Sequence, residues 1–217
     1  MNNPSLNKTG KEKQNILSRK IAVLAIALSM LVCVLMTVSC SSKGGDESEY
    51  SGPFDGREEA DLSGYESMED YSGEIMLVDT TVAEMDELMD AGESFVVFFS
   101  YEDCPYCNRL MPYLNEAAEK AGVKVGYIDT RSNPEWMSNM DIDGYDIVTK
   151  RLKKYLSKDE DGKLHLYTPD MYFIKGGKVA DRHEGVTEGA DDPSEELTSS
   201  QEETLMKDLA ASFEAIK

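Results

Sequence analysis

From residue 74 onward the apolar positions change their period several times, and each change predicts a new element. The run "SFVVFFS" is apolar almost throughout, which is typical of a strand buried on both faces. Other stretches repeat their apolar positions every three to four residues, as helices do. The expected strands cover 74–80, 94–100, 124–131, a stretch from about 171 and its hairpin partner after the glycines at 176 and 177, and the expected helices cover 81–93, 105–121, 145–157 and 201–216.

Local signals predict where several of these helices begin and end. Thr81 with Glu84 matches a capping box, and Ser200 with Glu203 does the same for the last helix. Gly122 directly follows the second helix, where glycine commonly ends one. The resulting order, β-α-β-α-β-α-β-β-α, predicts an α/β fold with a central mixed sheet flanked by helices.

The beginning of the chain has the character of an export signal. Basic residues precede an uncharged apolar run at 21–38, which is long enough for a membrane-spanning helix or for the core of a long signal. Cys40 follows this run after the small Ser39, and the sequence "SSKGG" comes next. This arrangement resembles the lipobox of bacterial lipoproteins, which implies that residues 1–39 are a signal peptide and that Cys40 is the lipidation site. Thr37 is less typical of a lipobox, so an uncleaved membrane anchor stays open. Both interpretations place the remaining chain outside the cytoplasm and tethered to a membrane.

Residues 40–73 differ in composition from the part that follows. They are rich in Gly, Ser, Asp and Glu and show no apolar periodicity. Such a composition predicts a disordered acidic linker, which would carry the lipidated N-terminus and leave 74–217 as the folded domain.

Charge excludes some classes of partner. The formal net charge is −20, and because the first 39 residues have a basic excess, the rest of the chain is more acidic still. Phosphate backbones and anionic headgroups would be repelled, so we expect no nucleic-acid partner.

The stretch "CPYC" at 104–107 carries the candidate chemistry. If Cys104 caps the helix that begins there, unpaired backbone N–H groups and the helix dipole stabilise its thiolate and lower its pKa. A metal site would need further ligands, and only His165 and His183 offer imidazoles, so we expect no metal. A purely structural disulfide between Cys104 and Cys107 stays open.

In context, the motif resembles a thioredoxin-family active site. It follows a buried strand and opens a helix, Pro112 lies where the family bends this helix, and Thr168-Pro169 precedes the fourth strand. The dipeptide Pro105-Tyr106 is the one typical of glutaredoxins. The segment 74–217 therefore looks like a thioredoxin fold.

This resemblance implies roles for individual residues. Cys104 would attack a substrate disulfide and Cys107 would resolve the mixed disulfide, so the redox-active cysteine pair would be the only cofactor. Pro169 would form a cis peptide bond facing the cysteines and, with Thr168, Pro105 and Tyr106, would position the substrate.

Two departures from the family pattern bear on the chemistry. Phe98 occupies the position at which thioredoxins have a buried aspartate, so the proton relay of that carboxylate cannot be carried over. Asp103 replaces the usual tryptophan and lies beside Glu102. Both carboxylates oppose the helix dipole, so we expect a less acidic Cys104 than the dipeptide alone suggests.

Together these features predict a membrane-tethered, extracytoplasmic thiol–disulfide oxidoreductase. Its partners would be protein thiol and disulfide substrates and a redox protein in or outside the membrane. The chain is also loosely similar to bacteriocin transport accessory proteins, which are often lipoproteins of Gram-positive bacteria. That similarity keeps open a binding or export-accessory module without essential redox turnover.

Overall fold

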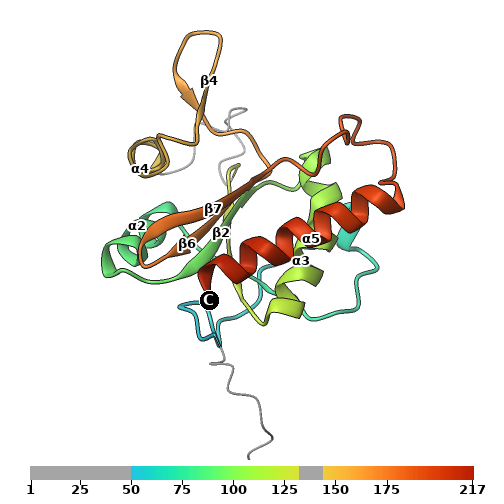
Figure 1. The fold of residues 1–217 in the computed structure, drawn as a ribbon, viewed down its shortest axis with the longest axis horizontal. Helices are drawn as coiled ribbons and strands as arrows, with labels where there is room; N and C mark the ends of the chain where they lie inside the picture. Colours follow the sequence, from blue (N-terminus) through green and yellow to red (C-terminus); the bar gives the residue numbers. More distant parts are fainter. Residues whose placement is uncertain (1–49, 132–143) are drawn as a thin grey trace, which may run out of the picture. The chain divides into compact units, whose positions relative to one another are not determined.

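A five-stranded mixed sheet lies at the centre of the structure, a computed structural model that describes residues 50–131 and 144–217 (Figure 1). The strand order is β1-β3-β2-β6-β7. Strands β1 and β2 run parallel to β3, whereas β6 is antiparallel to β2 and β7 to β6. The strands are β1 (Leu77–Asp79), β2 (Phe95–Ser100), β3 (Val125–Asp129), β6 (Asp170–Lys175) and β7 (Lys178–Glu184).

Helices cover both faces of this sheet. Helices α3 and α5 contact each other and lie side by side in Figure 1, and their apolar residues share one core cluster, whereas those of α2 and α4 belong to a second cluster. The helices are α2 (Val82–Ala91), α3 (Pro105–Ala121), α4 (Tyr145–Arg151) and α5 (Ser199–Ile216). This is the predicted α/β architecture, and its topology is that of the thioredoxin fold.

The central strand β2 explains why its sequence is apolar without a break. All of its residues are buried, and they alternate between the two cores. Val96 and Phe98 face the cluster of α3 and α5, and Phe95, Val97 and Phe99 face that of α2 and α4. A strand covered on both faces needs apolar residues at every position.

The predicted helix ends are confirmed at three places and corrected at a fourth. Thr81 accepts a hydrogen bond from the Glu84 N–H, and α3 covers the predicted residues and ends at Gly122, which has a left-handed backbone. The last helix, however, begins two residues earlier than expected, because Thr198 and Gln201 form the capping box. The expected cap at Ser200 is therefore wrong.

Two smaller elements also differ from the expectation. Helix α4 ends at Arg151 rather than near residue 157. The chain then forms a short antiparallel hairpin from β4 (Ser157–Lys158) and β5 (Leu164–His165), which the sequence pattern did not predict.

The predicted disordered linker is wrong for residues 50–73. This segment packs onto the domain, and it contains the short 3₁₀ helix η2 (Glu66–Met68). Its few apolar side chains are buried in the two core clusters, namely Phe54, Ala60, Leu62, Tyr65 and Met68. The rest of the predicted linker, the signal segment and the lipidation site Cys40 lie outside the described residues.

Phe54 shows how the segment is accommodated. Its ring is 1 % exposed and packs edge-to-face on Phe95, with ring centroids 5.8 Å apart. Gly126 in β3 makes room for it, because a Cβ atom there would lie 2.7 Å from the Phe54 ring. Because Gly126 has no side chain, the Phe54 ring from a distant segment can pack over β3.

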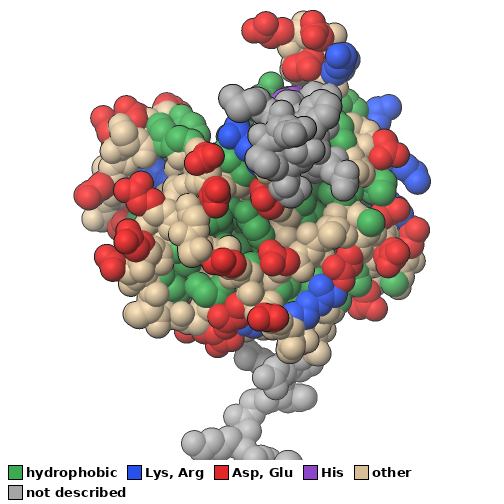
Figure 2. Space-filling view, turned by 180° about the vertical axis from the view of Figure 1, so that it is seen from behind, with side chains coloured by type: hydrophobic (Ala, Val, Ile, Leu, Met, Phe, Trp, Pro, Cys, Tyr) green, Lys and Arg blue, Asp and Glu red, His purple; other side chains and the backbone are tan. Residues whose placement is uncertain are grey.

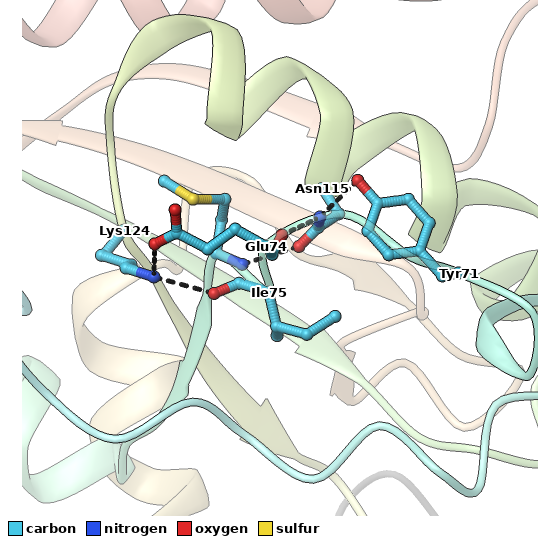
Figure 3. A network of polar contacts seen from close by, with 6 residues as sticks. Tyr71, Glu74, Ile75, Asn115 and Lys124 are labelled. Carbon is cyan, nitrogen blue, oxygen red and sulfur yellow. Dashed lines mark hydrogen bonds and ion pairs between the residues drawn. The ribbon is translucent and has the colours of Figure 1, made fainter.

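Polar contacts hold the end of the segment against α3 (Figure 3). The buried Asn115 side chain donates to the Tyr71 hydroxyl and the Glu74 carbonyl and accepts from the Met76 N–H, each at 2.8 Å. Lys124 donates to Glu74 and to a neighbouring carbonyl. A fully satisfied buried amide fixes the chain that leads into β1.

Acidic side chains are spread over the surface. Figure 2 shows many Asp and Glu side chains and fewer Lys and Arg on the face that it presents. Within the described residues, no helix is long and apolar enough to cross a membrane.

Candidate active site

Cys104 lies where strand β2 gives way to helix α3. It occupies the N-cap position with extended backbone angles, and its sulfur accepts a hydrogen bond from the Cys107 N–H at 3.2 Å. Pro105 follows at the first helical position, where its lack of an N–H costs nothing. The predicted capping geometry is therefore present, with both cysteines as free thiols.

Thr168 contacts Cys104, and Pro169 follows it directly before β6. The Cys104 thiol donates to the Thr168 carbonyl at 3.8 Å, and the Thr168 hydroxyl lies 3.9 Å from the Cys104 sulfur. The Thr168–Pro169 peptide bond is cis, as the resemblance implied. The fold thus brings Thr168 into contact with Cys104, with Pro169 next to it in the chain.

The two thiols differ in their surroundings. The pKa of Cys104 is lowered to about 6, mainly by a hydrogen bond from the Cys107 side chain and against the effect of its own burial. Burial, followed by the hydrogen bond to Cys104, raises the pKa of Cys107. Glu102 and Asp103 are exposed, and the pKa of Cys104 is set by hydrogen bonds from Cys107, Thr168 and Tyr106 and by its own burial rather than by these carboxylates. The arrangement provides a nucleophile at Cys104 and a protonated reserve thiol at Cys107.

A groove of about 570 Å³ lies beside the cis-proline. Pro169 and the half-buried Tyr106 line it together with Tyr167, an exposed aromatic residue with 45 % of its surface accessible. The Tyr106 hydroxyl donates to the Asp191 carbonyl at 2.5 Å, which holds this side chain along the groove. Three acidic residues, Glu184, Glu188 and Asp191, also line the groove.

Asp170 anchors the backbone directly after Pro169. It is fully buried and accepts from Arg182 Nε at 2.8 Å, from Arg182 Nη2 at 2.9 Å and from the Tyr172 hydroxyl at 2.6 Å. Burial raises the pKa of Asp170 to about 6 although Arg182 acts in the opposite direction. The pair therefore ties β6 to β7 beside the site.

Three polar residues near Cys107, namely Ser100, Tyr65 and Tyr127, were not predicted from the sequence. Ser100 is fully buried at the end of β2, and it lies within hydrogen-bonding reach of Cys107 and lowers the pKa of that thiol. The Tyr65 hydroxyl lies 2.7 Å from Ser100 Oγ and 3.1 Å from the Tyr127 hydroxyl. Ser100 was visible as the only hydroxyl within the β2 sequence, but nothing in the acidic segment singled out Tyr65.

The histidines do not form a site with the cysteines. His183 bonds the Val186 carbonyl through Nε2, and His165 lies against the Tyr167 ring. Among residues 50–131 and 144–217, no three His, Cys, Asp or Glu side chains are grouped so as to hold a metal ion.

Several solved thioredoxins resemble the chain in fold. Thioredoxin O2 of Arabidopsis thaliana is 17 % identical over 62 % of this chain and 95 % of its own, with a TM-score of 0.36. For the thioredoxin of Aeropyrum pernix the identity is 23 %, over 50 % of this chain and 74 % of that one, with a TM-score of 0.32. The oxidised thioredoxin of Plasmodium falciparum is 19 % identical over 62 % of this chain and 96 % of its own, with a TM-score of 0.33. No protein-family model and no curated protein matches the sequence.

Removing the Cys107 side chain tests what stabilises the Cys104 thiolate. In Cys107→Ala the strongest hydrogen bond to the thiolate is lost while the backbone N–H remains, so the pKa of Cys104 rises above about 6. The measurement is the rate of iodoacetamide alkylation against pH, on the full chain carrying Cys33→Ser and Cys40→Ser. Cys107→Ser keeps a hydroxyl donor, so the pKa of Cys104 in this variant should stay closer to that of the parent. A midpoint for Cys107→Ala at or below that of the parent would show that this hydrogen bond does not control the thiolate.

Breaking the buried ion pair tests the anchor after Pro169. Arg182→Met leaves the Asp170 carboxylate buried without its cation, which we expect to cost about 3 kcal/mol of unfolding free energy at pH 8. The pKa of Asp170, already raised to about 6, rises further in the variant, whereas in the unfolded chain it is about 3.9. The folded state therefore binds the extra proton, and the deficit relative to wild type shrinks as the pH falls from 8 towards 4.

Denaturant titration at several pH values measures this deficit. Glu184→Gln is the matched control, because Glu184 also pairs with Arg182 but is 43 % exposed and should contribute less than about 1 kcal/mol. A deficit for Arg182→Met that is independent of pH would contradict the account.

Proposed function

We propose that the chain is a thiol–disulfide oxidoreductase that acts on protein thiols and disulfides through Cys104 and Cys107. The observation that carries the proposal is the asymmetry of the pair, in which a capped Cys104 with a lowered pKa lies beside a buried Cys107 with a raised one. A scaffold has no need of two thiols that differ in this way. Attack on disulfides requires a thiolate, and resolution requires a second thiol within reach.

The steps follow from the geometry of the site. The Cys104 thiolate attacks one sulfur of a substrate disulfide, forms a mixed disulfide and releases the other sulfur as a thiolate. Cys107 then loses its proton and attacks Cys104, which releases the reduced substrate and leaves a Cys104–Cys107 disulfide. Thr168 contacts the reacting sulfur and lines the groove with Pro169, so a substrate backbone bound in this groove would present its cysteine to Cys104. Tyr106 lines the same groove, whereas Pro105, at the start of α3, lines a separate pocket.

The acidity of Cys104 bears on the direction of electron flow. A pKa of about 6 lies nearer to about 7 for thioredoxin than to about 3.5 for the strong oxidant DsbA. A less stabilised thiolate makes the reduced form less favoured and the protein a better electron donor. We therefore propose a reductant or isomerase rather than a strong oxidant, supplied with electrons by a redox partner in or across the membrane.

The redox equilibrium of the full chain in mild detergent tests the activity. With Cys33→Ser and Cys40→Ser present, we expect a reversible two-electron transition nearer to about −270 mV than to about −120 mV, and reduction of insulin disulfides. Cys104→Ser should abolish both. Two results together would contradict this proposal: no redox transition in the parent, and export assistance or partner binding that survives in a Cys104→Ser, Cys107→Ser double variant. The chain would then be a binding module.

We also propose that Cys40 carries the lipid that tethers the domain to the extracytoplasmic face of the membrane. The support is the sequence arrangement around this residue, with its basic start, apolar run and small residue before the cysteine. Cys40→Ala should block labelling by a radioactive fatty acid and leave a longer, unprocessed chain in the membrane fraction. If the variant and the parent show equal labelling and equal length, Cys40 is not the lipidation site, and the uncleaved membrane anchor is the interpretation that remains.

A further inference from the structure

A chain of buried hydroxyl groups leads away from Cys107. Ser100, at the end of β2, lies within hydrogen-bonding reach of the Cys107 thiol. Tyr65 Oη lies 2.7 Å from Ser100 Oγ and 3.1 Å from Tyr127 Oη. Ser100 is 0 % exposed, Tyr65 is 2 % and Tyr127 is 7 %, so exposure increases along the chain. Four polar groups from four segments of the protein therefore form one connected path from the resolving thiol towards solvent.

The resolving step needs such a path. Cys107 is fully buried, and burial raises the pKa of its thiol. Once Cys104 is bonded to a substrate sulfur, it has no thiolate that could accept the proton of Cys107. Phe98 occupies the position at which the resemblance to thioredoxins would place a carboxylate. The hydroxyl of Ser100, which can donate or accept, is then the first group of the path within hydrogen-bonding reach of the thiol.

We infer that Ser100, Tyr65 and Tyr127 relay the proton of Cys107 to solvent as Cys107 attacks the mixed disulfide. The inference rests on the proposed oxidoreductase function and adds residues to its second step. In this inference Ser100 takes the proton from the thiol, and Tyr65 and Tyr127 act through Ser100 as positioning and relay residues.

The step balances without a further reagent. Each hydroxyl accepts one proton and gives up its own, from the Cys107 sulfur to Ser100, to Tyr65, to Tyr127 and then to water. The electron pair left on the Cys107 sulfur forms the bond to Cys104 Sγ. The bond between Cys104 and the substrate sulfur breaks, and the substrate leaves as a thiolate that takes a proton from solvent.

The surroundings favour passage of the proton through neutral hydroxyls. Burial raises the pKa of Tyr65 and of Tyr127, so neither phenol holds a negative charge near neutral pH. Both hydrogen bonds of the path allow either oxygen to be the donor, as a relay requires. At the outer end, Asp129 and Asp79 also raise the pKa of Tyr127, and their negative charges attract a departing proton.

The titratable groups that face Cys107 come from every element packed around it. They are Cys104 on its own helix, Tyr101 after β2, Tyr65 before η2 and Tyr127 on β3. Arg131 stacks on the Tyr101 ring at 3.7 Å from its centroid and is the cation on that side. Tyr101 has no hydroxyl contact with Ser100 among the described residues, so the Tyr65 side provides the connected route.

The chromogenic disulfide dithiobis(nitrobenzoate) separates the two chemical steps. Attack by Cys104 releases one coloured thiolate at a rate that depends on reagent concentration. Resolution by Cys107 releases a second at a rate that does not. Stopped-flow absorbance on the full chain in mild detergent, with Cys33→Ser and Cys40→Ser, gives both rates as functions of pH.

Tyr65→Phe and Ser100→Ala each remove one oxygen from the path. We expect each to slow the second release by about tenfold or more near pH 7 and to move its pH profile upward, with the first release changed by less than about twofold. Tyr127→Phe should act in the same direction. Ser100→Thr restores the hydroxyl and should recover the rate. Tyr71→Phe is the matched control, because it removes a phenol oxygen that contacts Asn115 rather than Ser100.

Two outcomes would overturn the relay. One is a second release in Tyr65→Phe and Ser100→Ala with the parent rate and pH profile. The other is equal slowing of both releases with an unshifted profile, which would show a structural role only. Absence of any second release in the parent would instead defeat the proposed function, so the two failures are distinguishable.

Discussion

The burial of β2 on both faces is the constraint on which the rest of the structure depends. An uninterrupted apolar strand must be covered by helices on each side, and the two clusters supply α3 and α5 on one face and α2 and α4 on the other. The strand ends at Ser100, and four residues later Cys104 caps α3, which begins at Pro105. The position of the thiol at the free N–H groups of a helix is thus a consequence of where the buried strand ends.

The same burial produces the difference between the two cysteines. One turn of helix separates them, and Cys107 is fully buried, while Cys104 keeps its contacts with the helix N-terminus and with Thr168. Desolvation penalises a charged sulfur, and hydrogen bonds to that sulfur offset the penalty. Cys104 receives these bonds and Cys107 mostly does not. The roles proposed for Cys104 and Cys107 therefore follow from local packing. The ion pair of Asp170 and Arg182 holds the facing strand β6 against β7.

Much of this could be predicted from the sequence because the signals are local. The apolar run of β2, the proline at the start of α3 and Gly122 at its end act within a few residues, and their predictions are confirmed. The segment 50–73 gave no such signal, since its few apolar residues have no period and are held by partners far along the chain. Phe54 needs the space above Gly126, and Tyr65 needs the end of β2. Tertiary contacts of this kind cannot be read from spacing.

The relay that we infer uses hydroxyl groups rather than a buried carboxylate, and this choice has an energetic reason. An ionised carboxylate in a dry core costs several kcal/mol unless a cation or several donors compensate it, as Arg182 does for Asp170. Hydroxyl groups satisfy one another as both donor and acceptor, so the path through Ser100, Tyr65 and Tyr127 needs no buried charge. Phe98 can then fill the core where a charged group would have required compensation. The inferred path depends on Tyr65, a side chain from outside the sheet. Residues 50–73 would then be folded onto the domain for a chemical reason as well as for packing.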